Sequence, residues 1–310
     1  MPVRSASSHL AGAFAGEQAL TERQGALLVA GAGVVFSFTA IAYRAVDAAT
    51  DWQFLAYRGG STALAMIALI VLRRNSRPVR LRGTTTRTML AGLVLATVSM
   101  LYILALSRTT AAITLFLLAA APVFAAIFGW VLLREVVRRP TVIAILVTAI
   151  GVTVMVGSGL DAGSGTGVLS AAMIPVLIGL YNVLVRSDHE ADPVVPALIA
   201  GAILAVGSGM IALLDTGLSV SWRDAGLACI TGGVALGVGL PMFNLGHRSV
   251  AAARVSLLLM TEVVLAPLWV WIWPGETPRV GTLIGGAIVL GSVVWLVLTA
   301  TDQEDVLIVS

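Results

Sequence analysis

Apolar runs of about 20 residues recur along this chain, and charged residues are almost confined to the ends of these runs. This pattern constrains the fold most, because a run of that length crosses a bilayer as one helix whose backbone groups are hydrogen-bonded internally. Hydrophobic residues make up 58% of the chain and charged residues only 11%. The sequence therefore predicts an all-α integral membrane protein and disfavours a single large soluble core. Ten transmembrane helices are predicted, at residues 25–44, 52–72, 88–106, 110–133, 141–158, 167–186, 194–214, 223–244, 250–273 and 280–300.

The second half of the chain is a reworked copy of the first. Adding 141 to each residue number from 105 to 156 gives a counterpart between 246 and 297, without a gap. In this register Leu117 meets Leu258, and Trp130 meets Trp271. Each copy holds five predicted spans, and because five is odd the second copy must cross the membrane in the opposite direction. The sequence thus predicts two inverted five-helix repeats, an architecture found mainly in secondary transporters.

The distribution of arginine supports this inversion. Thirteen arginines fall on the N-terminal side of the predicted membrane and four on the other side, so both termini are predicted to be cytoplasmic. Residues 73–87 hold six arginines, whereas the equivalent loop of the second copy holds Arg223 alone. The predicted organisation is a cytoplasmic N-terminal tail at 1–24, a first repeat at 25–158, a linker at 159–166, a second repeat at 167–300 and a cytoplasmic C-terminal tail at 301–310.

The composition argues against several classes of function. All 19 basic residues are arginine, so the lysine of a P-loop and the lysine of a retinal Schiff base are both missing. Cys229 is the only cysteine, and the three histidines show no metal-ligand spacing, so we expect no cofactor and no metal. The arginines cluster at span ends, which does not indicate nucleic-acid binding. An intramembrane enzyme is disfavoured too, because the chain lacks paired intramembrane aspartates and a HExxH motif.

Two charged residues inside predicted spans are the strongest candidates for a solute site. Glu262 lies near the middle of its span, where an ionised side chain costs at least about 2.5 kcal/mol. It should therefore face a cavity or a partner, unless its carboxyl group is sealed in a helix contact. Its repeat equivalent is Ala121, so it breaks the internal symmetry, which favours function over packing. Arg58 lies inside the outer end of its span and either pairs with a carboxylate or extends to the interface.

Aromatic, amide and proline residues supply further candidates. Tyr102 and Phe243 are repeat equivalents that would stack on a flat apolar side chain, although helix aromatics also serve as core or interface residues. Pro122, Pro175 and Pro241 interrupt spans and are candidate hinges. The complete set of predicted binding residues is Glu262, Arg58, Tyr102, Tyr181, Asn182, Phe243, Asn244 and Tyr57.

The spans, the inverted copies and an acid after spans four and nine together resemble the drug/metabolite transporter superfamily, in its ten-helix EamA branch. The two acids stand in Leu133-Arg134-Glu135 and Pro274-Gly275-Glu276. Residues 54–60, FLAYRGG, are similar to the arginine-bearing start of span two in that family, and Thr261-Glu262-Val263 occupies the site of its Glu-Pro-Val element. The proline of that element is missing here and appears at Pro267 instead. Among EamA members the chain is most similar to bacterial YddG-type exporters of aromatic amino acids.

This resemblance implies helices from both copies around a central cavity that opens alternately to each side of a bacterial inner membrane. It implies export of amino acids, with Arg58 for the carboxylate, Glu262 for the ammonium group or a coupling proton, and tyrosines for the ring. A permease for a different metabolite or drug class is the first alternative. The second is a non-transporting sensor or scaffold, although no loop is long enough to hold a signalling domain.

Overall fold

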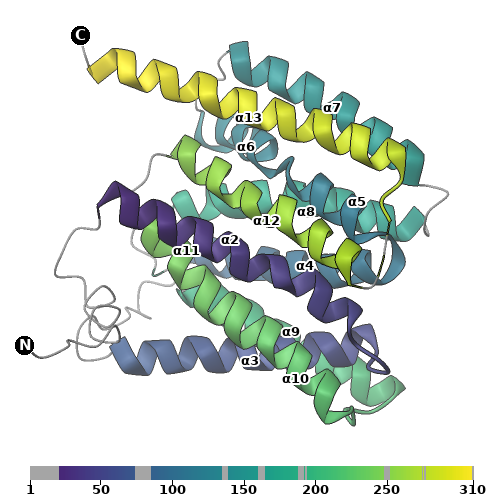
Figure 1. Ribbon diagram of the computed structural model, residues 1–310. Helices are drawn as coiled ribbons and strands as arrows, with labels where there is room; N and C mark the ends of the chain where they lie inside the picture. Colours follow the sequence, from purple (N-terminus) through teal and green to yellow (C-terminus); the bar gives the residue numbers. More distant parts are fainter. Residues whose placement is uncertain are drawn as a thin grey trace, which may run out of the picture.

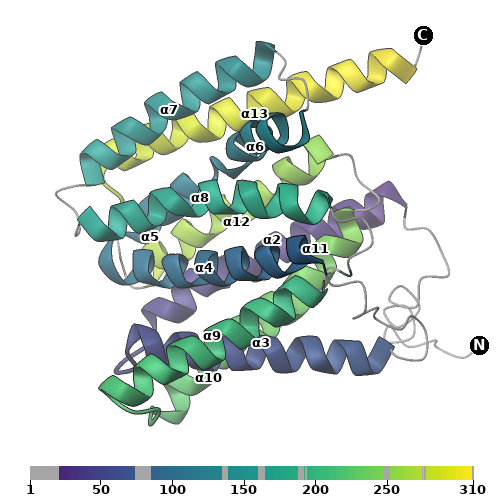
Figure 2. The ribbon, with the colours of Figure 1, turned by 180° about the vertical axis from the view of Figure 1, so that it is seen from behind.

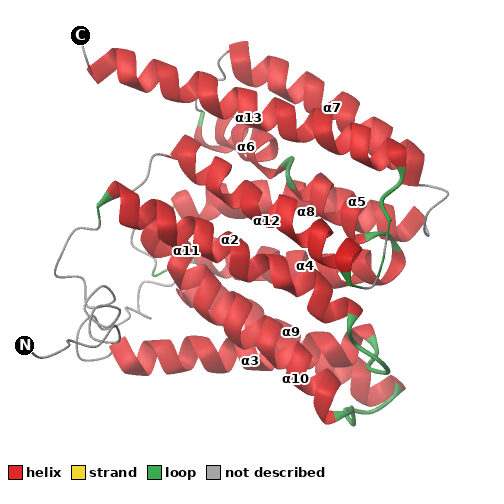
Figure 3. Cartoon of the chain, in the orientation of Figure 1, coloured by secondary structure: helices red, strands yellow, loops and turns green. Residues whose placement is uncertain are grey.

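The computed structural model describes residues 21–73, 85–134, 139–159, 165–187, 192, 194–247, 252–273, 275 and 277–308. All regular structure in these residues is helical, as Figure 3 shows. The elements are α2 (Glu22–Arg44), α3 (Asp51–Arg73), α4 (Thr86–Arg108), α5 (Ala111–Leu118), α6 (Ala121–Leu133), α7 (Arg139–Gly159), α8 (Gly165–Arg186), α9 (Val194–Asp215), α10 (Trp222–Ile230), the π-helix η2 (Thr231–Gly239), α11 (Leu240–His247), α12 (Ala252–Ile272) and α13 (Val280–Ile308).

Seven helical segments in the described residues are long and apolar enough to cross a membrane. They coincide with seven of the predicted spans. Shorter apolar stretches within α7, α12 and α13, at Val142–Val154, Thr261–Ile272 and Val280–Trp295, correspond to the other three. An all-α, multi-pass membrane protein is therefore supported, while the count of ten crossings stays a prediction.

Two spans that were predicted as continuous are divided. The span at 110–133 consists of α5 and α6, with Ala119 and Ala120 forming a turn between them. The span at 223–244 passes from α10 through η2 into α11. Its middle reads TGGVALGVG, and glycine is the weakest α-helix former after proline, which is consistent with the change of helix type there.

Two boundaries also differ from the predicted ones. Helix α8 begins at Gly165, inside the predicted linker at 159–166, and α13 continues to Ile308, so helix covers most of the predicted C-terminal tail. At the other terminus, α2 begins at Glu22 behind a capping box in which Thr21 and Gln24 exchange side-chain and backbone hydrogen bonds. The start of α2 and the end of α13 lie at the same end of the bundle in both Figure 1 and Figure 2.

The helices pair reciprocally between the two halves of the chain. Helix α3 packs on α9, and α7 packs on α13 along one side of the bundle (Figures 1 and 2). In the predicted repeats, α2 is the counterpart of α8, and α4 is the counterpart of the span formed by α10, η2 and α11. Helix α4 packs on α8, and α2 packs on α10, η2 and α11. In the same way, α5 and α6 pack on α8, and their counterpart α12 packs on α2. Each of these contacts is thus matched by a contact between the counterparts of the two helices.

Glycines allow the backbones of α3 and α9 to touch. A Cβ atom at Gly59 would lie 2.6 Å from the backbone nitrogen of Ala205, and one at Gly201 would lie 2.7 Å from that of Ala63. Small residues at a helix crossing permit such close approach, and in membranes this packing is a main source of helix association. The crossing fixes the turn of α3 that carries Arg58, the residue before Gly59.

Candidate functional site

Arg58 and Tyr102 bring polar groups into the interior of the bundle. Arg58 on α3 is 5% exposed and Tyr102 on α4 is 8% exposed. The guanidinium Nε and Nη1 atoms of Arg58 and the hydroxyl oxygen of Tyr102 are buried, and they form no hydrogen bond with the described residues. Buried polar groups in proteins are nearly always hydrogen-bonded to protein, water or ligand. These unsatisfied groups therefore mark a place where a further polar partner fits.

Glu262 belongs to the same cluster. It is half-buried on α12, and its carboxyl group interacts electrostatically with Arg58 and with Tyr102. No hydrogen bond joins the three side chains. Two opposite charges at this depth compensate each other, which reduces the cost of keeping either one away from water. The cluster thus offers a cation, an anion and a phenolic hydroxyl from three different helices.

The local structure around Arg58 holds its backbone firmly. Ser61 and Thr62 donate their hydroxyl groups to the Arg58 carbonyl at 3.0 Å and 2.8 Å. Helix η2 approaches the same carbonyl so closely that a Cβ atom at Gly232 would lie 2.0 Å from its oxygen. Arg58 therefore lies where α3 meets both α9 and the π-helix, and π-helical segments are frequent at functional sites.

Glu262 is positioned by the contact between α12 and α2. A Cβ atom at Gly33 would lie 3.4 Å from the backbone nitrogen of Glu262, so the two helices are in close contact at this level. Further along α12, the indole nitrogen of Trp269 donates to the hydroxyl of Ser37 at 3.0 Å, and its ring stacks on Phe38 with centroids 5.5 Å apart. These contacts fix the rotation of α12 and therefore the direction of Glu262.

The other predicted binding residues lie in different surroundings. The Tyr57 hydroxyl donates to the Leu218 carbonyl at 2.9 Å, in the loop before α10. Phe243 packs in two apolar clusters away from Tyr102, which is part of the main core. On α8, Tyr181 is half-buried and Asn182 is exposed. The side chain of Asn244 lies outside the described part of the chain. The structure thus brings Arg58, Tyr102 and Glu262 into one cluster, whereas Tyr57 and Phe243 have other partners.

The three candidate hinges lie at different kinds of position. Pro122 is in the first turn of α6, directly after the break at Ala119 and Ala120, so the predicted span is interrupted where this proline begins the second helix. Pro241 follows η2 at the start of α11, and Pro175 is buried inside α8. A hinge role for each stays a prediction.

The sequence analysis did not single out Asp224, which is buried and accepts several backbone hydrogen bonds. The sequence did contain one indication of a helix start. Asp224 follows Ser221 by three positions ahead of an apolar run, which is the spacing of a serine N-cap and an acidic residue in the first turn of a helix. Such a signal predicts a helix start, but it does not reveal a contact with a loop far away in the sequence.

The described fold and site define a multi-pass helical membrane protein with a charged cluster inside the bundle. Residues 23–157 match the family model described as "EamA-like transporter family", so this part of the chain is similar to a domain of that family. No curated protein sequence matches this chain. A protein of known crystal structure is similar over 90% of this chain and 99% of its own, with 20% identity and a TM-score of 0.65. At this identity the likeness shows a shared fold alone.

Proposed function

We propose that this protein is a secondary transporter that moves small molecules across a membrane by alternating access. The match to an EamA-like transporter domain supports this proposal, since it covers residues 23–157 and the predicted first repeat covers 25–158. The reciprocal pairing of helices supports a second, inverted repeat, because it is the pattern that a two-fold exchange of the two copies would give. Both termini would then be cytoplasmic, in a bacterial inner membrane.

The proposed substrate is an amino acid with an aromatic side chain, and the proposed direction is export. The observation that carries this substrate class is the buried guanidinium of Arg58, whose Nε and Nη1 atoms have no hydrogen-bond acceptor among the described residues, in electrostatic range of the Glu262 carboxyl group. A guanidinium binds a carboxylate through two parallel hydrogen bonds, and Glu262 is suited to an ammonium group. A zwitterion also brings no net charge into a buried site, which limits the desolvation cost.

Tyr102 completes the proposed site. Its hydroxyl has no hydrogen-bond partner among the described residues, so it can donate to the substrate carboxylate beside Arg58. Its ring offers an apolar face for an aromatic side chain. We also propose that Glu262 exchanges a proton during the cycle, since a carboxyl group in electrostatic range of a guanidinium can alternate between the substrate ammonium, a proton and Arg58.

Flux measurements in proteoliposomes test this proposal. Radiolabelled L-phenylalanine should exchange across the membrane, and an imposed pH gradient should drive its accumulation. Glu262→Gln cannot take up a proton and should lose the response to the gradient. Asp215→Asn, a matched change at an exposed position at the end of α9, should respond as the wild type does. A gradient response that persists in Glu262→Gln would exclude the coupling role.

Competition with unlabelled solutes distinguishes transport of aromatic amino acids from transport of the other substrate classes. Unlabelled aromatic amino acids should compete with L-phenylalanine more strongly than sugars or permanently cationic compounds. Stronger competition by either of the latter would favour a permease for another metabolite or drug class. If no solute of the panel is moved, a non-transporting sensor or scaffold is favoured.

A further inference from the structure

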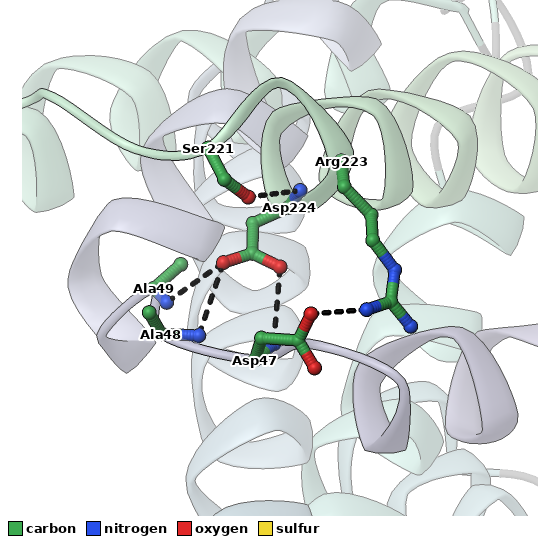
Figure 4. A network of polar contacts seen from close by, with 6 residues as sticks. All are labelled: Asp47, Ala48, Ala49, Ser221, Arg223 and Asp224. Atoms are coloured by element: carbon green, nitrogen blue, oxygen red, sulfur yellow. Dashed lines mark hydrogen bonds and ion pairs between the residues drawn. The ribbon is translucent and has the colours of Figure 1, made fainter.

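A buried carboxylate at one end of the bundle holds the loop between α2 and α3. Asp224, in the first turn of α10, is 1% exposed. Its carboxylate accepts backbone N–H groups from Asp47 at 3.0 Å, Ala48 at 3.1 Å and Ala49 at 3.0 Å, as Figure 4 shows. Its own backbone N–H donates to the Ser221 hydroxyl at 3.0 Å. Three consecutive amides of one half of the chain thus converge on a single charged group of the other half.

The loop before α10 is held in turn by donors from α3. The side-chain amide of Gln53 donates to the carbonyls of Gly217 at 2.8 Å and Ser219 at 3.3 Å. The Tyr57 hydroxyl donates to the Leu218 carbonyl between them. We call the arrangement of Asp224, Gln53 and Tyr57 with loops 45–50 and 216–221 the clasp.

An ion pair at the edge of the clasp adds little to it. Arg223 contacts Asp47 directly (Figure 4), but both side chains are at least half exposed. Exposed ion pairs contribute little in water, so the buried hydrogen bonds of Asp224 and Gln53 carry most of the attraction.

The side chains of the clasp are missing from the equivalent positions of the internal repeat. In the register of 141 residues, Gln53 corresponds to Val194 and Tyr57 to Leu198, which have no polar side-chain groups. In the same register Asp224 corresponds to Gly83, which has no side-chain carboxylate, and the third residue of α4 is Thr88, which has none either. The internal symmetry is therefore broken at this end of the bundle, as it is at Glu262.

The clasp is connected to the charged cluster through two helices. On α3, Tyr57 of the clasp directly precedes Arg58 of the cluster. On the other side, α10 carries Asp224 and continues into η2, where Gly232 contacts the Arg58 carbonyl. Separation of α3 from α10 at the clasp would therefore change the packing around Arg58.

We propose that the clasp is a latch that closes this end of the bundle and must open for the Arg58 cluster to be reached from that side. This inference rests on the proposed transport function. The latch favours the closed form because opening exposes a carboxylate and three amides that satisfy one another when the latch is shut. In this structure the clasp is formed, so the clasp end is shut.

Hydrogen–deuterium exchange followed by mass spectrometry tests the latch without any substrate. Asp224→Asn removes the charge, and Gln53→Leu breaks the other half of the clasp. Each variant should speed amide exchange at least about tenfold in loop 45–50 and in the first turns of α3 and α10. Asp215→Asn, the matched control at the same end of the bundle, should exchange as the wild type does. Unchanged exchange in both variants, or faster exchange confined to the amides of 47–49, would overturn the latch.

A cross-link tests whether the latch must open. In a Cys229→Ser background, Asp47→Cys and Arg223→Cys together place two thiols across the clasp, where a short bifunctional thiol reagent can bridge them. The bridged protein should lose at least about nine-tenths of its L-phenylalanine exchange, whereas each single-cysteine variant treated in the same way should keep it. Full exchange by the bridged protein would overturn the latch. If the untreated protein moves no L-phenylalanine, the proposed substrate is wrong, and the amide exchange alone decides on the latch.

Discussion

At the scale of single residues, the buried polar groups of Arg58 and Tyr102 are the most informative feature. A buried donor without a partner costs about 1–3 kcal/mol, and the fold bears that cost at three atoms of two neighbouring side chains. A packing role would be better served by apolar side chains of similar volume. The proposed role in binding would explain the cost, because the substrate carboxylate would supply the acceptor.

Two tyrosine-to-phenylalanine changes distinguish a binding hydroxyl from a structural one. Tyr102→Phe removes a hydroxyl without a hydrogen bond, so the melting temperature should stay the same or rise, while the affinity for substrate should fall. Tyr57→Phe removes the bond to Leu218 and should lower the free energy of unfolding by about 1 kcal/mol. Thermal unfolding of the detergent-solubilised variants measures both. A larger loss of stability in Tyr102→Phe than in Tyr57→Phe would contradict the assignment.

Sequence reasoning could find Arg58 and Glu262 because a charge inside an apolar span is costly and therefore conspicuous. It also named Tyr102, but it could not show that Tyr102 joins the charged pair while Phe243, its repeat equivalent, packs elsewhere. The direction of a side chain depends on how each helix is rotated, and glycine contacts between helices distant in sequence fix that rotation.

At the scale of helices, the sequence predicted the spans well and their irregularities poorly. Residues 23–44 and 194–215 lie close to predicted spans, because length and hydropathy determine them directly. The turn at Ala119 and Ala120 precedes Pro122, which has no N–H to donate to the Leu118 carbonyl and disfavours a helical residue before it. The proline indicated an interruption of this span, but not that two separate helices would form.

Alanine substitution at two glycines of one span tests how tightly η2 packs on α3. Gly232→Ala would place a Cβ atom 2.0 Å from the Arg58 carbonyl oxygen, and overpacking of this kind costs about 1–3 kcal/mol or more. Gly226→Ala, in α10, meets no atom within 4 Å and should be neutral or stabilising by up to about 1 kcal/mol. Thermal unfolding should therefore rank Gly226→Ala, the wild type and Gly232→Ala in order of decreasing stability. Equal stability of the two variants would disprove the close contact.

At the scale of the whole molecule, the register of 141 residues and the reciprocal pairing of helices point to the same arrangement. The register comes from the sequence alone, and the pairing comes from contacts between helices. The clasp could not be foreseen, because each hydrogen bond between its two halves joins residues more than 150 positions apart. Loop contacts of that range leave no periodic signal in a sequence.

Labelling of single cysteines tests the proposed orientation. In a Cys229→Ser background, Thr216→Cys lies at the clasp end and Thr86→Cys at the opposite end, and both positions are exposed. The arginine distribution puts the clasp end outside, so a membrane-impermeant maleimide should label Thr216→Cys in intact cells. Thr86→Cys should react only after the cells are opened. The reverse pattern would contradict the orientation, and labelling of both in intact cells would contradict the membrane arrangement.

Equilibrium binding to the purified protein tests the central claim most directly. L-phenylalanine and phenylethylamine, which lacks the carboxylate, should be compared on the wild type and on Arg58→Gln. The account predicts that the wild type binds L-phenylalanine at least about tenfold more tightly than phenylethylamine, and that Arg58→Gln removes this preference, because a charge-assisted pair contributes roughly 1.5–3 kcal/mol. Equal affinity of the wild type for both compounds, or an unchanged preference in Arg58→Gln, would contradict it.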